Sequence, residues 1–360
     1  MLKFCSKCVM DGSSEEVIFD EQGICNFCHQ AQKSLREIEV EKPNLNKWIE
    51  QIKKDGEGKD YDCLIGLSGG VDSATTLHHA VRLGLRPLCF TMDNGYNDPK
   101  ADENVLKLVE TLKVPLYRYV LDIHKFMELQ SAYLKAGVIN VEASYDHLLM
   151  ATTYKIADIY KIKWVLSGGN VATESIMPAS WSYSARDLTN LKSIYKWATG
   201  KRLKGLPVCG LFKWNIYRWW YDIKIFYLLD YLNYNRLESE KMLIERYGYQ
   251  SCGEKHEENI FTRWYQSFYL YTKFSIDKRK AHYSSLINAG QMTRAEAMEL
   301  LAHSPIYPEM GIEQKVLSYL KHSHYDFKTD EKIWNFMATI VRAWKKLLRK
   351  LIKIGEITKV

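Results

Sequence analysis

Short, uniformly apolar runs alternate with helix-like segments over residues 61–166 of the chain. Strands that are buried on both faces of a sheet read as continuous hydrophobic runs, whereas amphipathic helices repeat apolar residues with a period near 3.6. The pattern predicts strands at 61–67, 86–92, 116–120 and 164–166. It predicts helices at 72–83, about 101–112, from about 124, and at about 145–160. Because strands that alternate with helices form right-handed βαβ units, we expect an α/β fold with a parallel sheet.

The alternation stops near residue 175, and the remainder of the chain is helix-like and rich in aromatic residues. Within it, residues 212–232 are strongly aromatic but include charged side chains at Lys213, Arg218, Asp222, Lys224 and Asp230. A bilayer span would not carry these charges. We therefore expect a buried helix and strand here, with a surface that contacts a membrane or a partner as the alternative.

Composition changes of this kind predict three parts: a small module at 1–35, an α/β domain at 55–175 and a helical substrate-binding or partner region at 176–360. A polar, helix-like stretch follows the first module and ends at the glycine-rich residues 56–58. The last fifty residues are a basic helix-like segment.

The sequence Ser-Gly-Gly-Val-Asp-Ser at residues 68–73 directly follows the first predicted strand. Ser68, Gly69 and Gly70 can turn several backbone N–H groups inward to form an anion nest, and the next helix adds its unpaired N-terminal donors. Asp72 and Ser73 add a carboxylate and a hydroxyl that suit magnesium or a phosphate oxygen. An ordinary glycine turn is the alternative, and the missing lysine excludes a Walker A loop.

The run at 68–73 resembles the pyrophosphate-binding loop (PP-loop) of the ATP pyrophosphatases, which cleave ATP between the α and β phosphates and adenylate a substrate oxygen. The resemblance implies an adenine-nucleotide α-hydrolase-like core. It also implies that Leu67 and residues 68–70, 72 and 73 bind ATP.

Two further polar turns follow predicted strands: Asp93-Asn94-Gly95 and Gly168-Gly169-Asn170. Ligands of parallel sheets bind outside the carboxyl ends of the strands, so these turns should lie beside the loop at 68–73. The resemblance implies that residues around Thr91 to Asp93 face the adenine or ribose, and that residues 168–170 lie along the nucleotide. It also suggests that Glu174 shares a magnesium ion with Asp72, although the chain departs here from the better-known family segment, and a plain surface acid is as good an interpretation.

Four cysteines near the N-terminus form two Cys-x-x-Cys pairs, Cys5 with Cys8 and Cys25 with Cys28. This spacing is typical of zinc knuckles, and four thiolates leave no open position for water, so we expect a structural zinc ion. A redox pair or an iron–sulfur cluster is the alternative. The other cysteines, Cys63, Cys89, Cys209 and Cys252, are isolated, and no third Cys-x-x-Cys exists for sulfur transfer.

The chain has 360 residues, 46% of them hydrophobic, and a formal net charge of +7. Such a charge suits an anionic substrate, a nucleic acid or a membrane surface equally well. The absence of a secretory pattern and the isolated cysteines favour a reducing, cytoplasmic location.

Four motifs in the second half, at residues 253–257, 261–263, 274–282 and 290–294, make the chain resemble the N-acetyl sugar amidotransferases of bacterial surface-polysaccharide biosynthesis. With the cysteine pairs and the loop at 68–73, the resemblance spans residues 5 to about 310. It implies adenylation of an N-acetyl group on a nucleotide-linked sugar, followed by displacement of AMP by ammonia to give an acetamidino sugar. The cofactors implied are ATP and Mg²⁺.

The second-half motifs offer a cationic set for the developing phosphate charge or for the diphosphate of a sugar nucleotide: Lys255, Arg263, Lys278 and Arg279. His256 could orient the substrate or ammonia. A solvated charge run is the alternative for Lys278 and Arg279, and a structural histidine is the alternative for His256.

The chain carries only a faint likeness to a glutaminase nucleophile elbow at residues 205–210, without the strand–turn–helix that the elbow needs. We therefore expect a separate glutaminase subunit to supply ammonia, no nucleic acid and no transmembrane segment. Two other functions compete: a tRNA-modifying enzyme of the thiolase or lysidine type, and a zinc-ribbon binding module with a degenerate nucleotide fold.

Overall fold

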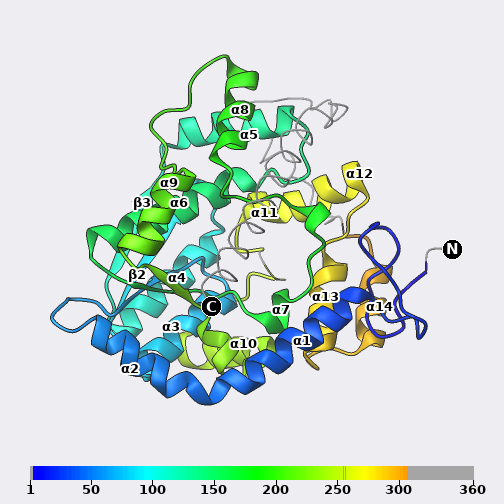
Figure 1. Ribbon diagram of the computed structural model, residues 1–360, viewed down its shortest axis with the longest axis horizontal. Coiled ribbons are helices and arrows are strands. Elements are labelled where there is room, and N and C mark those ends of the chain that lie inside the picture. Colours follow the sequence, from blue (N-terminus) through cyan, green and yellow to red (C-terminus); the bar gives the residue numbers. More distant parts are fainter. Residues whose placement is uncertain (1–2, 254, 256, 306–360) are drawn as a thin grey trace, which may run out of the picture.

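The computed structural model describes residues 3–253, 255 and 257–305, and its centre is a five-stranded parallel sheet (Figure 1). The strands lie in the order β3-β2-β1-β4-β5, and every neighbouring pair is parallel. Their bounds are β1 Cys63–Gly66, β2 Pro87–Asp93, β3 Leu116–Val120, β4 Trp164–Leu166 and β5 Lys224–Phe226. The order reverses between β1 and β4, which is where parallel α/β sheets bind ligands.

The helices that surround and extend the sheet are α1 Asn26–Glu41, α2 Leu45–Asp55, α3 Val71–Arg82, α4 Pro99–Leu112, α5 Ile123–Lys135, α6 Ala143–Ile159, α7 Val171–Glu174, α8 Leu188–Thr199, α9 Leu211–Asn215, α10 Arg236–Tyr247, α11 Ile260–Trp264, α12 Leu270–Phe274, α13 Arg279–Asn288 and α14 Arg294–Ala302. Short 3₁₀ turns cover Lys42–Asn44, Ala179–Trp181 and Leu228–Tyr231. Two π-helical turns, η3 Ile216–Trp220 and η5 Tyr265–Tyr269, continue α9 and α11.

Both faces of the central strands β1, β2 and β4 are buried, as their uniformly apolar sequences predict, whereas the edge strand β3 is partly exposed. Cys63 and Ile65 of β1 pack with α2, α3, α4 and α10 on one face. Leu64, between them, packs on the other face with α6 and the α9–η3 helix. The alternation of side chains along β1 therefore produces a three-layer α/β core.

The predicted α/β architecture is confirmed, and the four predicted strands correspond to β1–β4. The fifth strand, β5, comes from residues 224–226, within the segment 212–232 where a helix and a strand were expected. It pairs with β4, although it lies beyond the predicted 55–175 unit. The division into three parts stays a prediction.

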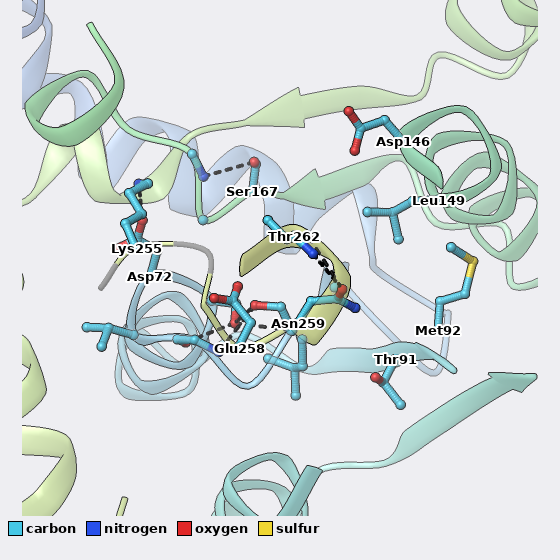
Figure 2. Close-up of a pocket in the computed structure, with 18 of the residues that line it drawn as sticks. Asp72, Thr91, Met92, Asp146, Leu149, Ser167, Lys255, Glu258, Asn259 and Thr262 are labelled. Atoms are coloured by element: carbon cyan, nitrogen blue, oxygen red, sulfur yellow. Dashed lines mark hydrogen bonds and ion pairs between the residues drawn. The ribbon is translucent and has the colours of Figure 1, made fainter. Parts of the chain in front are cut away.

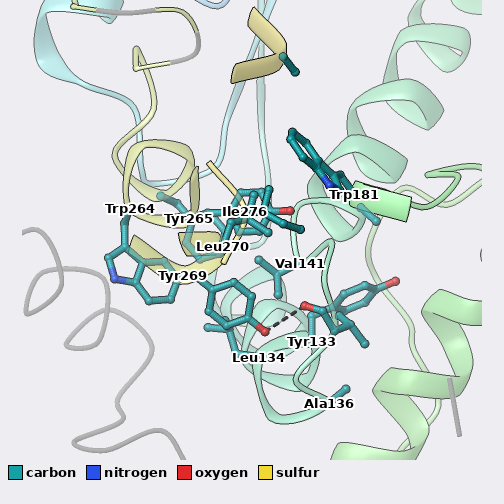
Figure 3. Packing of buried hydrophobic residues seen from close by; sticks show 14 of the residues in the cluster. Tyr133, Leu134, Ala136, Val141, Trp181, Trp264, Tyr265, Tyr269, Leu270 and Ile276 are labelled. Carbon is teal, nitrogen blue, oxygen red and sulfur yellow. Dashed lines mark hydrogen bonds between the residues drawn. The ribbon is translucent and has the colours of Figure 1, made fainter. Parts of the chain in front are cut away.

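A second core lies beside the sheet and joins α5 to the aromatic α11–η5–α12 helix (Figure 3). Tyr265 and Tyr269 donate hydrogen bonds from their hydroxyls to the carbonyls of Ile139 and Val138, at 2.7 and 2.9 Å. These bonds fix the second half of the chain against the loop that leads into α6.

The N-terminal cysteine module packs on α13 and α14, close to the described end of the chain (Figure 1). Val9 N–H donates to Ser284 Oγ at 3.2 Å, and Arg294 Nε donates to the Cys8 carbonyl at 3.1 Å. Among the described residues, no helix is both long and apolar enough to cross a membrane.

Candidate active site

A cavity of about 520 Å³ opens at the carboxyl ends of the strands (Figure 2). The exits of β1, β2 and β4 form its floor, α6 forms one wall, and residues 252–278 cover it. It lies at the point where the strand order reverses, so the topology alone places a ligand site here.

The loop at residues 68–73 forms one end of this cavity. The Ser73 hydroxyl donates to the Gly70 carbonyl at 3.1 Å and lies 3.3 Å from Ser68 N, while Ser68 Oγ accepts from Gly70 N–H at 3.2 Å. Gly70 is the N-cap of α3 and provides no side-chain cap. The first turn of α3 therefore keeps donors for an incoming anion.

Gly69 lies on the outer side of this loop and does not line the cavity. Its φ of +84° is in the left-handed region, and a Cβ at this position would lie 2.4 Å from the Ala101 carbonyl oxygen. Any other residue would push the loop away from α4. The glycine that the sequence singled out is thus required by both backbone conformation and space.

Asp72 stands at the centre of a polar cluster contributed by three separate segments. Its carboxylate accepts from Lys255 Nζ at 2.5 Å and from the Tyr234 hydroxyl. Lys255 Nζ also lies 2.9 Å from Glu174 Oε1 and 2.6 Å from Thr173 Oγ1. The Lys255 ammonium thus lies between the two carboxylates, Asp72 and Glu174, whose sharing of a magnesium ion stays a prediction.

The Lys255 side chain is 9% exposed, and burial opposes its charge. The carboxylates of Asp72 and Glu174 outweigh burial and raise the pKa of Lys255, so it is an ammonium at neutral pH. A magnesium ion held by Asp72 and Glu174 would have to lie beside this ammonium or displace it. Carboxylate oxygens are the ligands that Mg²⁺ prefers, so the pair suits that ion chemically.

Glu258 lies over the loop and was not expected from the sequence. Its Oε1 is 2.9 Å from the position that a Cβ on Gly70 would take, and its carboxylate interacts with Ser68. Burial raises the pKa of Glu258. The carboxylate thus lies where the loop would hold a phosphate, and Gly70 leaves the room for it.

The opposite end of the cavity carries a second pair of carboxylates, Glu142 at the N-cap of α6 and Asp146 in its first turn. Figure 2 shows Asp146 across the cavity from Lys255. Burial raises the pKa of Asp146 to about 7, with a further rise from Glu142 and an opposing effect of Lys278. Burial also raises the pKa of Glu142, against the effects of Lys278, Thr262 and Gln266. This end is suited to exchanging protons near neutral pH.

The other predicted nucleotide residues divide into two sets. Leu67, Gly168 and Gly169 line the cavity, as does the unpredicted Ser167, and a Cβ on Gly168 would lie 3.0 Å from Ser73 N. Asn170 lies beneath them: it caps α7 by accepting from Thr173 N–H at 2.9 Å, and it approaches Asp72 Oδ2 at 3.5 Å.

Asp93 is not among the residues that line the cavity. It accepts from Arg118 Nη2 at 2.8 Å and from Gly95 N–H at 3.0 Å, so it orders the turn after β2. Its neighbours Thr91 and Met92 line the cavity instead. Nucleotide binding by Asp93 itself stays a prediction.

The predicted cations also separate. Lys255 and Lys278 line the cavity, whereas Arg263 and Arg279 line only a smaller cavity of about 60 Å³ beside it, which the two lysines also border. Arg263 Nη2 donates to the carbonyls of Cys252 and Glu257, at 3.2 and 2.8 Å, and so braces the segment that bears Lys255. Arg279 is held by Asp277 at 2.7 Å and donates to the Leu300 and His303 carbonyls. His256 lies outside the described residues.

Cys5, Cys8, Cys25 and Cys28 form one buried cluster, with all four sulfurs within 4.8 Å of one another. A tetrahedral zinc ion with Zn–S bonds of about 2.3 Å separates its ligands by about 3.8 Å. The sulfurs of Cys8 and Cys25 lie 3.7 Å apart, and those of Cys5 and Cys28 lie 3.9 Å apart. The donor set therefore fits zinc.

Several N–H groups point at these sulfurs, as expected for thiolates. Cys5 Sγ accepts from Cys25 N–H at 3.2 Å, and Cys8 Sγ accepts from Met10 N–H at 3.4 Å. From α13, Asn288 Nδ2 donates to Cys28 Sγ at 3.2 Å. Such outer contacts orient metal ligands, and they connect the cysteine cluster to the second half of the chain.

Residues that sequence inspection missed are those whose partners are distant in the chain: Asp146, Glu142, Glu258 and Tyr234. One local signal existed, because Glu142 and Asp146 are spaced four apart at the start of a helix otherwise rich in apolar residues. Nothing in the local sequence distinguishes the partly buried Glu258 from acids that lie on a protein surface.

Comparison with known proteins gives one family match, at residues 258–346, to the family described as "LPS biosynthesis protein WbpG-like, C-terminal domain". Part of this match lies beyond the described residues. An uncharacterized protein of Methanocaldococcus jannaschii, MJ1599, is 26% identical over 166 residues, or 46% of this chain. The matched part spans 58% of that protein's length.

Two solved structures show a weak overall likeness. NMN synthetase from Francisella tularensis is 16% identical, with a TM-score of 0.33 over 71% of this chain and 93% of its own. NH3-dependent NAD synthetase from Campylobacter jejuni is 16% identical, with a TM-score of 0.31 over 45% of this chain and 72% of its own.

The family match covers, from residue 258 onward, the segment that closes the cavity, including Glu258, Asn259, Thr262 and Lys278, but not Lys255. This segment is also where the sequence resembles the sugar amidotransferases. Residues 258–346 are thus similar to the C-terminal domain of WbpG-like LPS biosynthesis proteins, which confirms the predicted resemblance to enzymes of surface-polysaccharide synthesis.

Proposed function

We propose that the chain is an ATP-dependent, AMP-forming amidotransferase that converts an N-acetyl group of a nucleotide-linked sugar into an acetamidino group during O-antigen or related surface-glycan synthesis. The observation that supports it best is the cavity itself. One end has the anion-binding loop with Asp72 and Lys255, and the other has the Glu142–Asp146 pair. Residues of the segment 258–346, which matches the LPS biosynthesis family, lie between them.

In the proposed reaction ATP binds with its β and γ phosphates on the loop at 68–73. The N-acetyl amide oxygen attacks the α-phosphorus, pyrophosphate leaves, and the amide N–H proton is released. Backbone N–H groups of the loop and the Lys255 ammonium would stabilise the charge that develops on pyrophosphate. Magnesium held by Asp72 and Glu174 would supply further charge neutralisation when bound.

The second step takes place on the resulting O-adenylyl imidate. Ammonia attacks the imidate carbon, the bond to AMP breaks, and the nitrogen loses a proton as the amidine forms. A carboxylate that titrates near neutral pH suits the removal of that proton, and Asp146 provides one on the cavity wall. Zinc at the four cysteines would be structural.

The assay that tests this function measures AMP release from ATP by the purified chain with a panel of UDP-N-acetyl sugars, with and without ammonium chloride. We expect AMP only when both a sugar nucleotide and ammonium are present. Glutamine should replace ammonium only when a separate glutaminase is added, consistent with a cytoplasmic partner subunit. AMP release that depends on tRNA and ignores the sugars would instead support a tRNA-modifying enzyme.

A further inference from the structure

The helix formed by α9 and the π-helical turn η3 bears large apolar side chains on its solvent side. Phe212, Trp219 and Trp220 are 82, 77 and 83% exposed, and Leu211 and Tyr221 are exposed as well. Isolated exposed apolar residues are common, but two tryptophans and a phenylalanine on one short helix are not. The sequence prediction of a buried helix here holds only for its other side.

That other side is firmly anchored. Trp214 and Tyr217 are buried, and both contact Tyr154 of α6, with ring centroids 4.5 and 5.4 Å apart. The helix therefore presents its outer aromatic side chains from a fixed position, at little cost in conformational entropy when they bind. The π-helical turn itself is uncommon and often marks a functional position.

The charges around this surface are mostly positive. Lys213 and Arg218 are exposed on the helix and form no ion pair among the described residues, although the Lys213 ammonium also lies over the Tyr217 ring, 5.5 Å from its centroid. Residues 211–220 include no acidic side chain, and the next acid, Asp222, is paired with Lys224 at 2.8 Å. The surface thus combines tryptophan and phenylalanine with cations that have no acidic partner among the described residues.

We propose that the α9–η3 surface, comprising Leu211, Phe212, Lys213, Arg218, Trp219 and Trp220, binds the headgroup region of an anionic lipid bilayer. Tryptophan is favoured at the boundary between headgroups and acyl chains, and lysine and arginine are attracted to anionic lipid. A protein partner would also suit the aromatic side chains, but it would have to place acidic side chains opposite both cations. An anionic bilayer carries negative charge over its whole surface.

Binding in this mode would hold the cavity close to the bilayer. Tyr154 lines the cavity with one side of its ring system and contacts the α9–η3 helix with the other. This arrangement is independent of which reaction the cavity performs.

The test is co-sedimentation of the full chain with vesicles of phosphatidylglycerol and, separately, with vesicles of pure phosphatidylcholine, both at the same lipid concentration. We expect binding to phosphatidylglycerol vesicles that weakens in 0.5 M salt, and little binding to pure phosphatidylcholine. Lys213→Gln with Arg218→Gln should weaken partitioning roughly thirtyfold, as about 1 kcal/mol per cation implies. Trp219→Ser with Trp220→Ser should weaken it at least about tenfold.

The matched control is Trp197→Ser, because Trp197 is an exposed tryptophan on α8, outside this surface. It should leave binding unchanged, and circular dichroism should show that all variants fold. Absence of binding by the wild-type chain would overturn the proposal, as would equal binding by the Trp219/Trp220 variant. If the wild-type chain binds no vesicles but self-associates, and the Trp219/Trp220 variant does not self-associate, then the surface joins two copies instead.

Discussion

The ammonium group of Lys255 lies 2.5 Å from the Asp72 carboxylate, although 183 residues separate them in the chain. Asp72 belongs to the first turn of α3, directly behind the anion-binding loop. Lys255 belongs to the segment that covers the cavity. One ion pair thus fixes the position of the second half of the chain relative to the loop, and it brings a cation to the place where phosphate charge would develop.

Replacing Lys255 should therefore impair both activity and stability. Lys255→Met leaves Asp72 and Glu174 facing each other without a cation, and we expect AMP formation to fall at least about 100-fold. The free energy of unfolding should fall by roughly 2 kcal/mol, less than the full cost of a buried unpaired charge because Glu174 is partly exposed. The measurements are AMP release and urea denaturation.

The control for that variant is Lys107→Met, which removes an exposed pair with Glu103 at 2.8 Å on α4. It should change stability by less than about 0.5 kcal/mol and leave AMP formation intact. Wild-type AMP formation by Lys255→Met would contradict the catalytic position given to Lys255.

Gly69 can be tested against a glycine of similar backbone conformation. Gly69 and Gly58 have φ values of +84° and +71°, but only a Cβ on Gly69 meets a neighbour, the Ala101 carbonyl oxygen at 2.4 Å. Gly58→Ala should cost about 1 kcal/mol through strain alone, whereas Gly69→Ala should cost roughly 3 kcal/mol and weaken ATP binding. Equal losses in urea denaturation would show that the contact with α4 is unimportant.

The cysteine cluster should bind one zinc ion per chain, measurable by elemental analysis. Because Asn288 Nδ2 donates to Cys28 Sγ, Asn288→Ala should lower zinc affinity by roughly 10- to 100-fold in a chelator competition. Asn233→Ala, an exposed position away from the cysteines, is the control. If elemental analysis instead finds stoichiometric iron and the protein absorbs visible light, the cysteines hold an iron–sulfur cluster and not zinc.

Asp146 should give the protein a pH dependence centred near neutrality. Its pKa is raised to about 7 by burial and Glu142, so the folded chain binds more protons than the unfolded chain between about pH 4 and 7. Its contribution to stability is therefore complete below about pH 4 and is lost as the pH rises toward 7. Asp146→Asn should flatten that part of the stability profile, measured by thermal unfolding.

Ionisation of Asp146 should raise turnover over the same pH range in which it lowers stability. A base must be deprotonated, so ammonia-dependent AMP release should rise through about pH 7, and Asp146→Asn should reduce it at least about 100-fold. Asp158→Asn, on the same helix and paired with Lys161 at the surface, should retain both activity and the pH profile. An unchanged pH profile in Asp146→Asn would assign the proton transfer elsewhere.

Local patterns predicted the part of the site built from strand exits. The loop at 68–73 and the turn at 168–170 carry glycines whose spacing and context are informative, and the parallel sheet brings them to one edge. Asp146 and Glu258 were not predicted because their significance depends on segments that approach from elsewhere in the chain. Arg279 stays a predicted cation of the site, although its contact with Asp277 two residues away already accounts for its position.

The hydrogen bond from Asn288 to Cys28 spans 260 residues, so the two ends of the described chain complete each other. During synthesis the cysteine module emerges well before α13 and α14, which are both available only after residue 302. At about 5–20 residues per second, the module waits roughly 13–50 s for these helices. Its apolar side, with Val9 beneath Tyr283 and Ala297, is uncovered on the ribosome for that time. The module therefore reaches its final packing long after it is made, and early metal binding would protect it meanwhile.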